Sequence, residues 1–330
     1  MEELLLRVLE GANPDTRAIE RLRPLSGGAV QETWLFEAIG PDGVSPLVLR
    51  RARGSLRADR RHGIDLPTEA NVVRLAEHGG VPVPHIRHVL QPDDELGDGF
   101  IMDFVEGETI PRRILREQGF APLRAGLAAE CGAALAAIHR LDAQGVAGLP
   151  AHQPAAAIER IDQDYLALDA PGPVFELAFR WLKDNMIPDL ERLSLVHGDF
   201  RLGNLLVGPD RLRAVLDWEG AHLGDPHEDL GYIAITSWRF GEIDHPVGGF
   251  GSREALFEAY ERAGGCTVDP ARVHFWELAY TMNWGIQCAQ MAEQFLTGAD
   301  PSVERGAIGR RRSETELDLL NLLDRSGSHA

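Results

Sequence analysis

Cysteine is scarce in this chain of 330 residues, which has three cysteines and no CxxC pair. Cys131, Cys266 and Cys288 are far apart and odd in number. They therefore exclude a disulfide framework and offer no zinc-binding spacing. This usage is typical of a reduced compartment, so we expect a cytoplasmic protein.

Basic residues are also scarce relative to acidic ones. The chain has 33 lysines and arginines against 51 acidic residues, a net charge of −18. A surface of that sign repels phosphate backbones and anionic head groups, so we expect neither a nucleic-acid partner nor a membrane. The acidic surface serves solubility or, alternatively, attracts a cationic substrate.

The N-terminal stretch is not typical of a leader sequence, and long apolar runs are few. The N-terminal MEELLLRVLE is acidic and has neither a basic n-region nor a cleavage site. The longest apolar run, AGLAAECGAALAAI, contains Glu130 and is too short to span a bilayer. We therefore expect a soluble protein, and its oligomeric state stays open.

Strand signals dominate the first ~105 residues. RLRPLSGGAVQETWLFEAI predicts two strands around a glycine turn, PLVLRRA a third, and HIRHVLQPDDELGDGFIMDFVEG a hairpin around an acidic turn. Between them, TEANVVRLAEHGG has helical spacing, with Pro67 near its start and Gly79 at its end. The pattern predicts a small antiparallel sheet with one main helix.

Helical spacing dominates from about Glu106 onward. It covers LRAGLAAECGAALAAIHRLD, VFELAFRWLKDNMIPDL, REALFEAYERAGG, ARVHFWELAYTMNWGIQCAQMAEQFL and ETELDLLNLLDR. The stretch from Leu195 to Tyr232 interrupts these helices with a strand and a hairpin. We therefore predict an α+β fold with two lobes, and a cleft between them where ligands tend to bind.

The interrupting stretch, LVHGDFRLGNLLVGPDRLRAVLDWEGAHLGDPHEDLGY, gathers residues that can do chemistry. Asp199 and Asn204 share one loop, and the hairpin NLLVGPDRLRAVLDW returns the chain so that Asp217 comes back near Asn204. Oxygen ligands of this kind suit Mg²⁺. One of the carboxylates can stay free to receive a proton from an attacking hydroxyl.

HGDxxxxN, followed by a hairpin and an aspartate, resembles the catalytic core of the aminoglycoside phosphotransferase (APH)-like kinases. Those kinases are relatives of the protein kinases, which carry HRDxxxxN and DFG. LDWEGAHLGDPHEDLGY is similar to the LDWE…GDPxxDL pattern of the branch that some organisms fuse to acyl-CoA dehydrogenase domains. The resemblance covers roughly residues 20 to 320.

The resemblance implies a bilobal protein-kinase-like fold that transfers the γ-phosphoryl group of ATP to a hydroxyl of a small molecule, with Mg²⁺. It implies an ATP-binding lobe over residues 1–105, with a hinge at about 102–105. A catalytic and substrate-binding lobe would follow over residues 106–330.

The resemblance also implies a role for each motif residue. Asp199 would accept the proton of the substrate hydroxyl, while Asn204 and Asp217 would hold Mg²⁺. The residues expected to support the loop are His197 and Asp229. Those expected to bind ATP are Ser26, Gly27, Gly28, Arg50, Glu69 and the backbone of Asp103 and Val105. The substrate candidates are Glu219, Trp276, Tyr280 and Trp284.

Two positions depart from the kinase pattern. The third strand carries Arg50 where kinases usually have lysine, which keeps the charge but makes efficiency and nucleotide preference open questions. Gly198 stands where protein kinases have the arginine that reads a phosphorylated loop. A small-molecule kinase therefore fits better than a regulated protein kinase.

Simpler interpretations stay open at this point. The aspartates can be turn residues, the SGG motif a plain hairpin turn, Arg50 and Glu69 a surface ion pair, and the aromatic residues of the late helix core. A nucleotide-binding pseudokinase is one alternative function. A phosphohydrolase is another, with a metal held by His197, His222 and His227. The aromatic residues favour an amphiphilic alcohol, such as a hydroxylated acyl compound, over an aminoglycoside.

Overall fold

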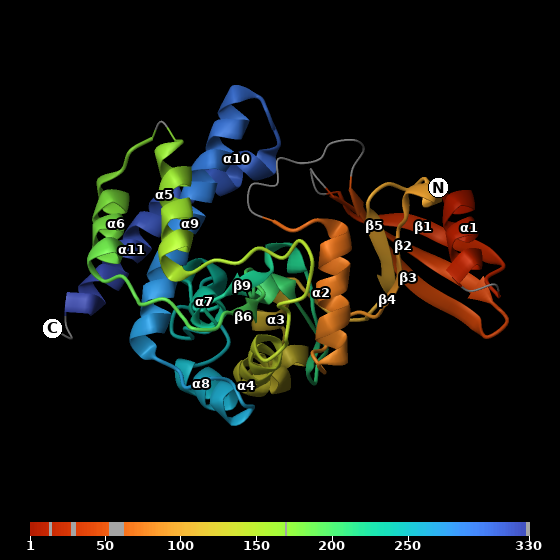
Figure 1. Cartoon of the computed structure of the whole chain (residues 1–330), viewed down its shortest axis with the longest axis horizontal. Helices are drawn as coiled ribbons and strands as arrows, with labels where there is room; N and C mark the ends of the chain where they lie inside the picture. Colours follow the sequence, from red (N-terminus) through yellow and green to blue (C-terminus); the bar gives the residue numbers. More distant parts are fainter. Residues whose placement is uncertain (13–14, 28–30, 53–62, 169, 328–330) are drawn as a thin grey trace.

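The N-terminal part of the chain is built on one antiparallel sheet (Figure 1). The computed structural model describes residues 1–12, 15–27, 31–52, 63–168 and 170–327. The strand order is β1-β2-β3-β5-β4. Their bounds are β1 (Ala18–Gly27), β2 (Gln31–Gly40), β3 (Gly43–Ala52), β4 (Ile86–Val89) and β5 (Gly99–Asp103). The predicted sheet and the β4–β5 hairpin are confirmed.

Two helices cover the two faces of this sheet. α1 (Glu2–Ala12) contributes Leu5 and Val8 to an apolar cluster with Leu49 of β3. α2 (Leu66–His78) lies on the other side, between the sheet and the helical part (Figure 1). Asp65 caps α2, since its carboxylate accepts the Thr68 N–H at 2.8 Å. The main helix is thus confirmed, and α1 is a second helix that the strand-dominated prediction did not include.

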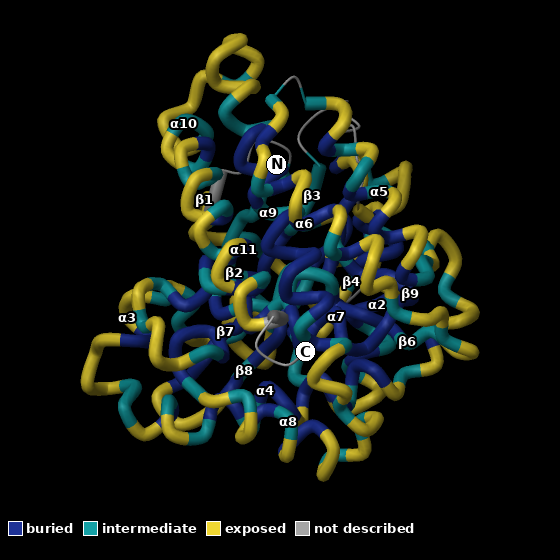
Figure 2. Tube along the Cα trace, turned by 90° about the vertical axis from the view of Figure 1, so that its left-hand side faces the viewer, coloured by how far each residue is buried: buried dark blue, intermediate teal, exposed yellow. Residues whose placement is uncertain are grey.

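The rest of the chain is mainly helical, as predicted. Its helices are α3 (Pro111–Arg116), α4 (Ala121–His139), α5 (Pro154–Leu166), α6 (Pro173–Asp184), α7 (His227–Tyr232), α8 (Arg253–Arg262), α9 (Pro270–Thr297), α10 (Val303–Gly309) and α11 (Arg312–Gly327). The sequence pattern missed α3, α5 and α10. Figure 2 shows how the buried residues fill the interior beneath an exposed outer layer.

Helix α4 is the central helix of the larger core. With its preceding turn it spans residues 118–139, which is long and apolar enough, by length and composition alone, to cross a membrane. The expectation that this run is too short was therefore wrong. Half of its most apolar window is buried inside the fold, and Leu127, Cys131 and Leu135 belong to the main core cluster. Core packing accounts for its apolar character without a membrane.

Four short strands frame the loops that hold the motif. β6 (Ser194–Val196) pairs with β9 (His222–Gly224), and β7 (Leu205–Val207) pairs with β8 (Leu212–Val215), both antiparallel. The predicted hairpin is thereby confirmed. It places the loop before β7 beside the loop after β8, because paired antiparallel strands bring their outer ends together.

Candidate active site

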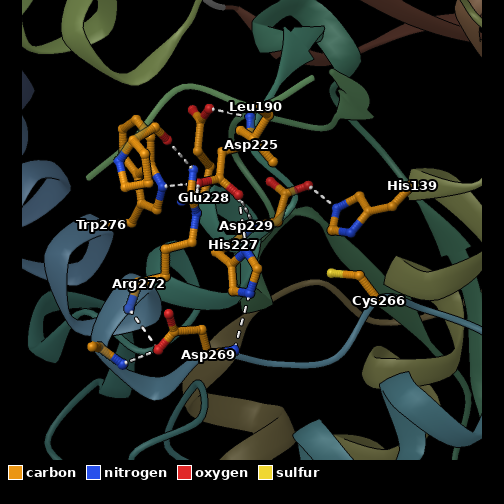
Figure 3. A network of polar contacts seen from close by, with 12 residues as sticks. His139, Leu190, Asp225, His227, Glu228, Asp229, Cys266, Asp269, Arg272 and Trp276 are labelled. Carbon is orange, nitrogen blue, oxygen red and sulfur yellow. Dashed lines mark hydrogen bonds and ion pairs between the residues drawn. The ribbon is translucent and has the colours of Figure 1, made fainter. Parts of the chain in front are cut away.

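The loop between β6 and β7 is tied down from beneath by Asp229 of α7. The Asp229 carboxylate accepts the backbone N–H groups of His197 at 2.8 Å and Gly198 at 3.0 Å. It also accepts the His139 Nε2–H at 3.0 Å, as Figure 3 shows. Burial opposes ionisation, but these hydrogen bonds outweigh it and lower the pKa of Asp229. Asp229 thus lies where a loop-supporting residue must lie.

Asp199 projects from this loop and is held by three donors. Its Oδ1 accepts the Tyr232 hydroxyl at 2.6 Å and Arg201 Nε at 2.9 Å, while its Oδ2 accepts Asn204 Nδ2 at 2.5 Å. Burial, followed by the charge of Asp199, raises the pKa of Tyr232 well above its usual value. The sequence interpretation missed Arg201 and Tyr232, although Arg201 is only two residues from Asp199 and Tyr232 ends the motif.

His197 links this loop to the strand that leads to Asp217. Its Nδ1 accepts the Asp199 N–H at 3.2 Å, and its Nε2 faces the Leu216 carbonyl at 3.1 Å. A carbonyl can only accept, so the network assigns the proton to Nε2. Burial lowers the pKa of His197, in keeping with a neutral ring. The residue therefore connects two loops as a neutral hydrogen-bonding bridge.

Asp217 and Asn204 meet where the hairpin closes. The Leu216 N–H donates to the Asn204 carbonyl at 2.8 Å, so the two predicted metal ligands belong to adjoining backbone segments. Asn204 directs its Nδ2 toward Asp199, which turns its Oδ1 the other way. One carboxylate and one amide oxygen fit Mg²⁺, which keeps several waters and shares phosphate oxygens.

The alternative metal cluster of histidines does not form. Over the described ranges of the chain, no group of three or more His, Cys, Asp or Glu side chains is placed to hold a metal ion. His197 and His222 bind backbone carbonyls, and His227 binds Asp225. The geometry thus gives the phosphohydrolase alternative no metal site.

Arg50 of β3 reaches three carboxylates at once. Its Nη2 lies 2.5 Å from Asp217 Oδ1, 3.5 Å from Glu69 Oε1 and 3.7 Å from Glu219 Oε2. Burial opposes the charged form, but the carboxylates outweigh it and raise the pKa of Arg50. The pair with Glu69 is therefore no surface ion pair, because Glu69 is 2% exposed.

Glu69 and Arg50 also have unused hydrogen-bonding capacity. Burial raises the pKa of Glu69 to about 7, although Arg50 opposes the shift. Glu69 Oε2 and Arg50 Nε are both buried without a hydrogen-bond partner. A guanidinium whose Nε has no partner can still bind a phosphate oxygen. The arrangement suits the predicted nucleotide site.

The predicted glycine turn and hinge are described only in part. Ser26 and Gly27 end β1, where they pair with Thr33 and Glu32 of β2, and Gly28 lies outside the described residues. At the hinge, Asp103 donates its N–H to the His85 carbonyl at 2.9 Å.

Beyond Asp103 the backbone continues through Phe104, whose N–H binds the Pro46 carbonyl at 3.1 Å. The Asp103 carboxylate pairs with Arg87. These two N–H groups are therefore used within the protein. The Asp103 carbonyl and the backbone of half-buried Val105 remain the groups through which the predicted adenine contact can be made.

A cavity of about 1390 Å³ opens beside Asp199 and Asp217. Three of the four substrate candidates line it, namely Glu219, Tyr280 and Trp284. Trp276 does not, because it is 0% exposed and donates its indole N–H to Asp225 at 2.8 Å. The structure thus places Trp276 in the core and corrects its assignment as a substrate candidate.

Asp225 is the centre of the buried network that fastens α7 to α9 (Figure 3). It accepts His227 Nδ1 at 2.8 Å, Arg272 Nε at 2.6 Å and the Trp276 indole. Burial opposes ionisation, but the hydrogen bonds from His227 and Trp276 outweigh it and lower the pKa of Asp225 to about 2. This network therefore fixes α7, the helix that carries Asp229.

Known sequences match most of the chain. A sequence model described as the phosphotransferase enzyme family matches residues 21–276. Acyl-CoA dehydrogenase family member 11 of Gallus gallus is 27% identical over 348 residues, covering 98% of this chain and 43% of that protein. Member 10 of Mus musculus is 29% identical over 199 residues, covering 58% of this chain and 18% of that protein. The chain thus spans less than half of either relative.

Solved structures show the same architecture. A Ralstonia eutropha protein provisionally called an aminoglycoside phosphotransferase superposes with a TM-score of 0.76 at 22% identity, covering 98% of each chain. A macrolide 2'-phosphotransferase of Brachybacterium faecium gives 0.63 at 21% identity, with coverage of 96% and 98%. APH(4)-Ia with AMP-PNP and hygromycin B gives 0.59 at 17% identity, with coverage of 95% and 98%. At these identities the likeness shows the fold alone, and the predicted α+β, protein-kinase-like fold is confirmed.

Proposed function

Because the chain belongs to the phosphotransferase enzyme family, we propose that it uses ATP and Mg²⁺ to phosphorylate a hydroxyl group of a small molecule. Membership confirms the predicted enzyme class, a kinase, and the relatives confirm the predicted branch. The observation that carries the rest is the meeting of Asp199, Asn204 and Asp217 beside a large cavity, which Asp199 and Asp217 line.

In this proposal Asp199 orients the acceptor hydroxyl and takes its proton. Tyr232 and Arg201 hold Oδ1 while Asn204 holds Oδ2, so the carboxylate is fixed before a substrate arrives. A prearranged base lowers the entropic cost of reaching the transition state. Mg²⁺, held by Asp217 and Asn204 when bound, would neutralise charge on the phosphate oxygens.

The nucleotide would occupy the N-terminal lobe, which we place at residues 1–105 with its hinge at 102–105. Arg50 would bind the phosphates beside Glu69, and the turn of Ser26, Gly27 and Gly28 would cover them. The complex of APH(4)-Ia with an ATP analogue supports this choice of cofactor. Residues 106–330 would then hold the acceptor.

We also propose that the protein is located in the cytoplasm.

The cavity supports an amphiphilic acceptor better than a polycation. Its wall mixes the aromatic rings of Trp238, Tyr280 and Trp284 with charged side chains of both signs, which are Asp164, Asp199, Asp217, Glu219, Glu293, Arg160, Arg201, Arg305 and Arg311. Of the residues that the structure describes, Arg160 has no carboxylate within 4.0 Å. An aminoglycoside needs a wall dominated by carboxylates, whereas this one mixes aromatic rings with nearly equal numbers of acidic and basic side chains. A hydroxylated acyl compound or another amphiphilic alcohol is therefore the substrate class that we propose.

A screen for acceptor-dependent ADP formation tests this function. Hydroxyacyl thioesters, simple hydroxylated metabolites and aminoglycosides are offered with Mg·ATP to the wild type and to Asp199→Asn. We expect turnover with an amphiphilic alcohol, reduced roughly 10²–10⁴-fold in the variant. Equal ADP formation in the two proteins would contradict the role of Asp199.

A pseudokinase remains the second candidate because Arg50 replaces the usual lysine. Its guanidinium is engaged by Asp217 in the ligand-free protein, which opposes metal binding at that carboxylate. The pseudokinase predicts nucleotide binding without turnover on any alcohol. A measured turnover with one acceptor therefore removes it.

A further inference from the structure

His222 occupies an unusual place between the two loops of the site. It begins β9 and pairs with Val196 of β6, the residue just before the loop of Asp199. In the other direction it follows the loop of Asp217 by a few residues. The residue is 6% exposed and is one of those that line the acceptor cavity.

The partners of the His222 ring fix where its protons lie. Nδ1 is 2.9 Å from the Gly220 carbonyl, which can only accept, so Nδ1 carries a proton. Nε2 is 3.1 Å from Oε2 of Glu228, which is 1% exposed and also accepts the Tyr280 hydroxyl. If Nε2 carried no proton, its lone pair would point at the lone pairs of the carboxylate oxygen, and the two would repel each other. The contact therefore needs a second proton, and Glu228 is the charge that stabilises it on the ring.

The carbonyl that His222 holds is itself part of the contact between the loops. A Cβ atom at Gly198 would overlap the Gly220 carbonyl oxygen, so the two backbones touch directly. Gly198 has φ of +81°, which glycine adopts without strain. Fixing Gly220 therefore fixes the approach of the Asp217 loop to the Asp199 loop.

We propose that His222, as an imidazolium paired with Glu228, is a positioning residue that clamps Gly220 and thereby holds the metal-ligand loop against the catalytic loop. The clamp acts through the backbone at Gly220 and not on the reacting groups. Its effect on catalysis rests on the proposed function, whereas its effect on loop order does not.

The groups that face His222 set the pH at which its ring loses the hydrogen bond to Glu228. They are Glu228 of α7, Tyr280 of α9, Arg160 of α5 and His152, whose ring centroid lies 5.7 Å away. Burial and Arg160 oppose the charge, but Glu228 outweighs them and raises the pKa of His222 above 6.5. Because the folded pKa is raised, the clamp is complete below pH 6.5. It weakens as the pH rises through the folded value.

Histidine NMR tests the charge directly in the ligand-free protein. In a ¹⁵N-labelled sample, the signal that disappears in His222→Asn identifies His222 among the 12 histidines. We expect both ring nitrogens to be protonated at pH 6, with a titration above pH 6.5 that moves to lower pH in Glu228→Gln. A neutral His222 at pH 6 would overturn the proposal, as would a titration that Glu228→Gln does not move.

Two variants separate the two hydrogen bonds of the His222 ring. The amide of His222→Asn can replace Nδ1 and keep Gly220, whereas that of His222→Gln can replace Nε2 and keep only Glu228. Amide hydrogen exchange is followed at Gly198 and Ala221. We expect His222→Gln to speed it roughly tenfold, which is about the effect of losing one hydrogen bond on a local opening equilibrium, and His222→Asn to change it much less. Equal exchange in wild type and His222→Gln would refute the clamp.

Binding of Mg·AMP-PNP links the clamp to the site. We expect His222→Gln to weaken the affinity roughly tenfold above the effect of His222→Asn. An unchanged affinity in His222→Gln would refute the link. If the wild type itself binds no Mg·AMP-PNP, the proposed function fails, while NMR and hydrogen exchange still decide whether the clamp exists.

Discussion

Asp217→Asn isolates the predicted metal ligand with little change to the fold. Asp217 has φ of +65° and ψ of +68°, a left-handed conformation that asparagine adopts readily. Alanine at this position would add about 1–2 kcal/mol of backbone strain. Asparagine is therefore the matched replacement, since it keeps the shape and the backbone while removing the negative charge.

Without ligand, Asp217→Asn should lower the free energy of unfolding only slightly. Arg50 loses its charged partner at 2.5 Å but keeps Glu69 at 3.5 Å, and the new amide oxygen can still accept from it. The Asp217 side chain is 30% exposed, so water replaces part of what is lost. We expect a decrease of about 1 kcal/mol in the free energy of unfolding.

The effect on ligand binding should be much larger. A nucleotide at 100 times its dissociation constant stabilises the wild type by about 2.7 kcal/mol. If the lost metal ligand weakens binding about 100-fold, the stabilisation at the same concentration falls to about 0.4 kcal/mol. At roughly 2 °C per kcal/mol for a chain of this size, a ligand-induced Tm shift of roughly 5 °C falls to roughly 1 °C.

Differential scanning fluorimetry with AMP-PNP measures this shift, once with Mg²⁺ and once with EDTA. Asp210→Asn is the matched control, because Asp210 lies at the far turn of the same hairpin and pairs only with Arg213 among the described residues. It should keep the full shift. A Mg²⁺-dependent shift in Asp217→Asn equal to that of the wild type would show that another residue holds the metal.

Three further changes probe the surroundings of the site. Arg50→Met should cost about 3 kcal/mol in urea unfolding at pH 8, because buried Glu69 must then either stay ionised without its cation or take up a proton on folding, and Arg50→Lys should cost much less; equal stabilities would contradict the buried pair. Gly198→Ala should destabilise by more than about 2 kcal/mol, because its Cβ would overlap the Gly220 carbonyl at positive φ; a soluble variant with wild-type Tm would refute that contact. The pKa of Asp225 falls from 3.8 to about 2 on folding, so its contribution of roughly 2 kcal/mol is present above pH 4 and lost as the pH falls through 2. Acid unfolding followed by circular dichroism should therefore steepen between those values, and a flat stability there would count against the network.

The parts of the fold that the sequence predicts are those fixed by local patterns. Two-residue alternation and turn residues are enough to predict the sheet and the β7–β8 hairpin, because both depend on neighbours in the chain. The hairpin in turn predicts that Asp217 returns to Asn204, and the backbone bond from Leu216 to Asn204 shows this closure. Asp229 beneath the loop came from the resemblance instead.

The parts that the sequence does not predict depend on helix rotation and distant packing. Trp276, Tyr280 and Trp284 lie four residues apart on one helix, and the sequence does not say which of them face the core. Each step of four residues turns about 40° around a helix, so Trp276 and Trp284 differ by about 80°. That rotation separates Trp276, bound to Asp225, from Trp284 in the cavity wall.

The bonds of Tyr232 to Asp199 and of His222 to Glu228 are also unpredicted. The spacing of Tyr232 from Asp199 is set by a whole strand, hairpin and helix turn between them. His222 and Glu228 are close in sequence, but only burial gives their contact its strength. No local pattern carries either signal.

The two halves of helix α9 serve different purposes. Near its start, Trp276 and Arg272 hold Asp225, and farther on, Gln287, Gln290 and Met291 line the cavity. At 1.5 Å per residue, Trp276 and Gln290 are about 21 Å apart. Mutations in the far half can therefore accumulate without loosening the loop that performs the chemistry. In a lineage of such enzymes, the range of accepted alcohols is free to drift while the phosphoryl-transfer apparatus is inherited unchanged.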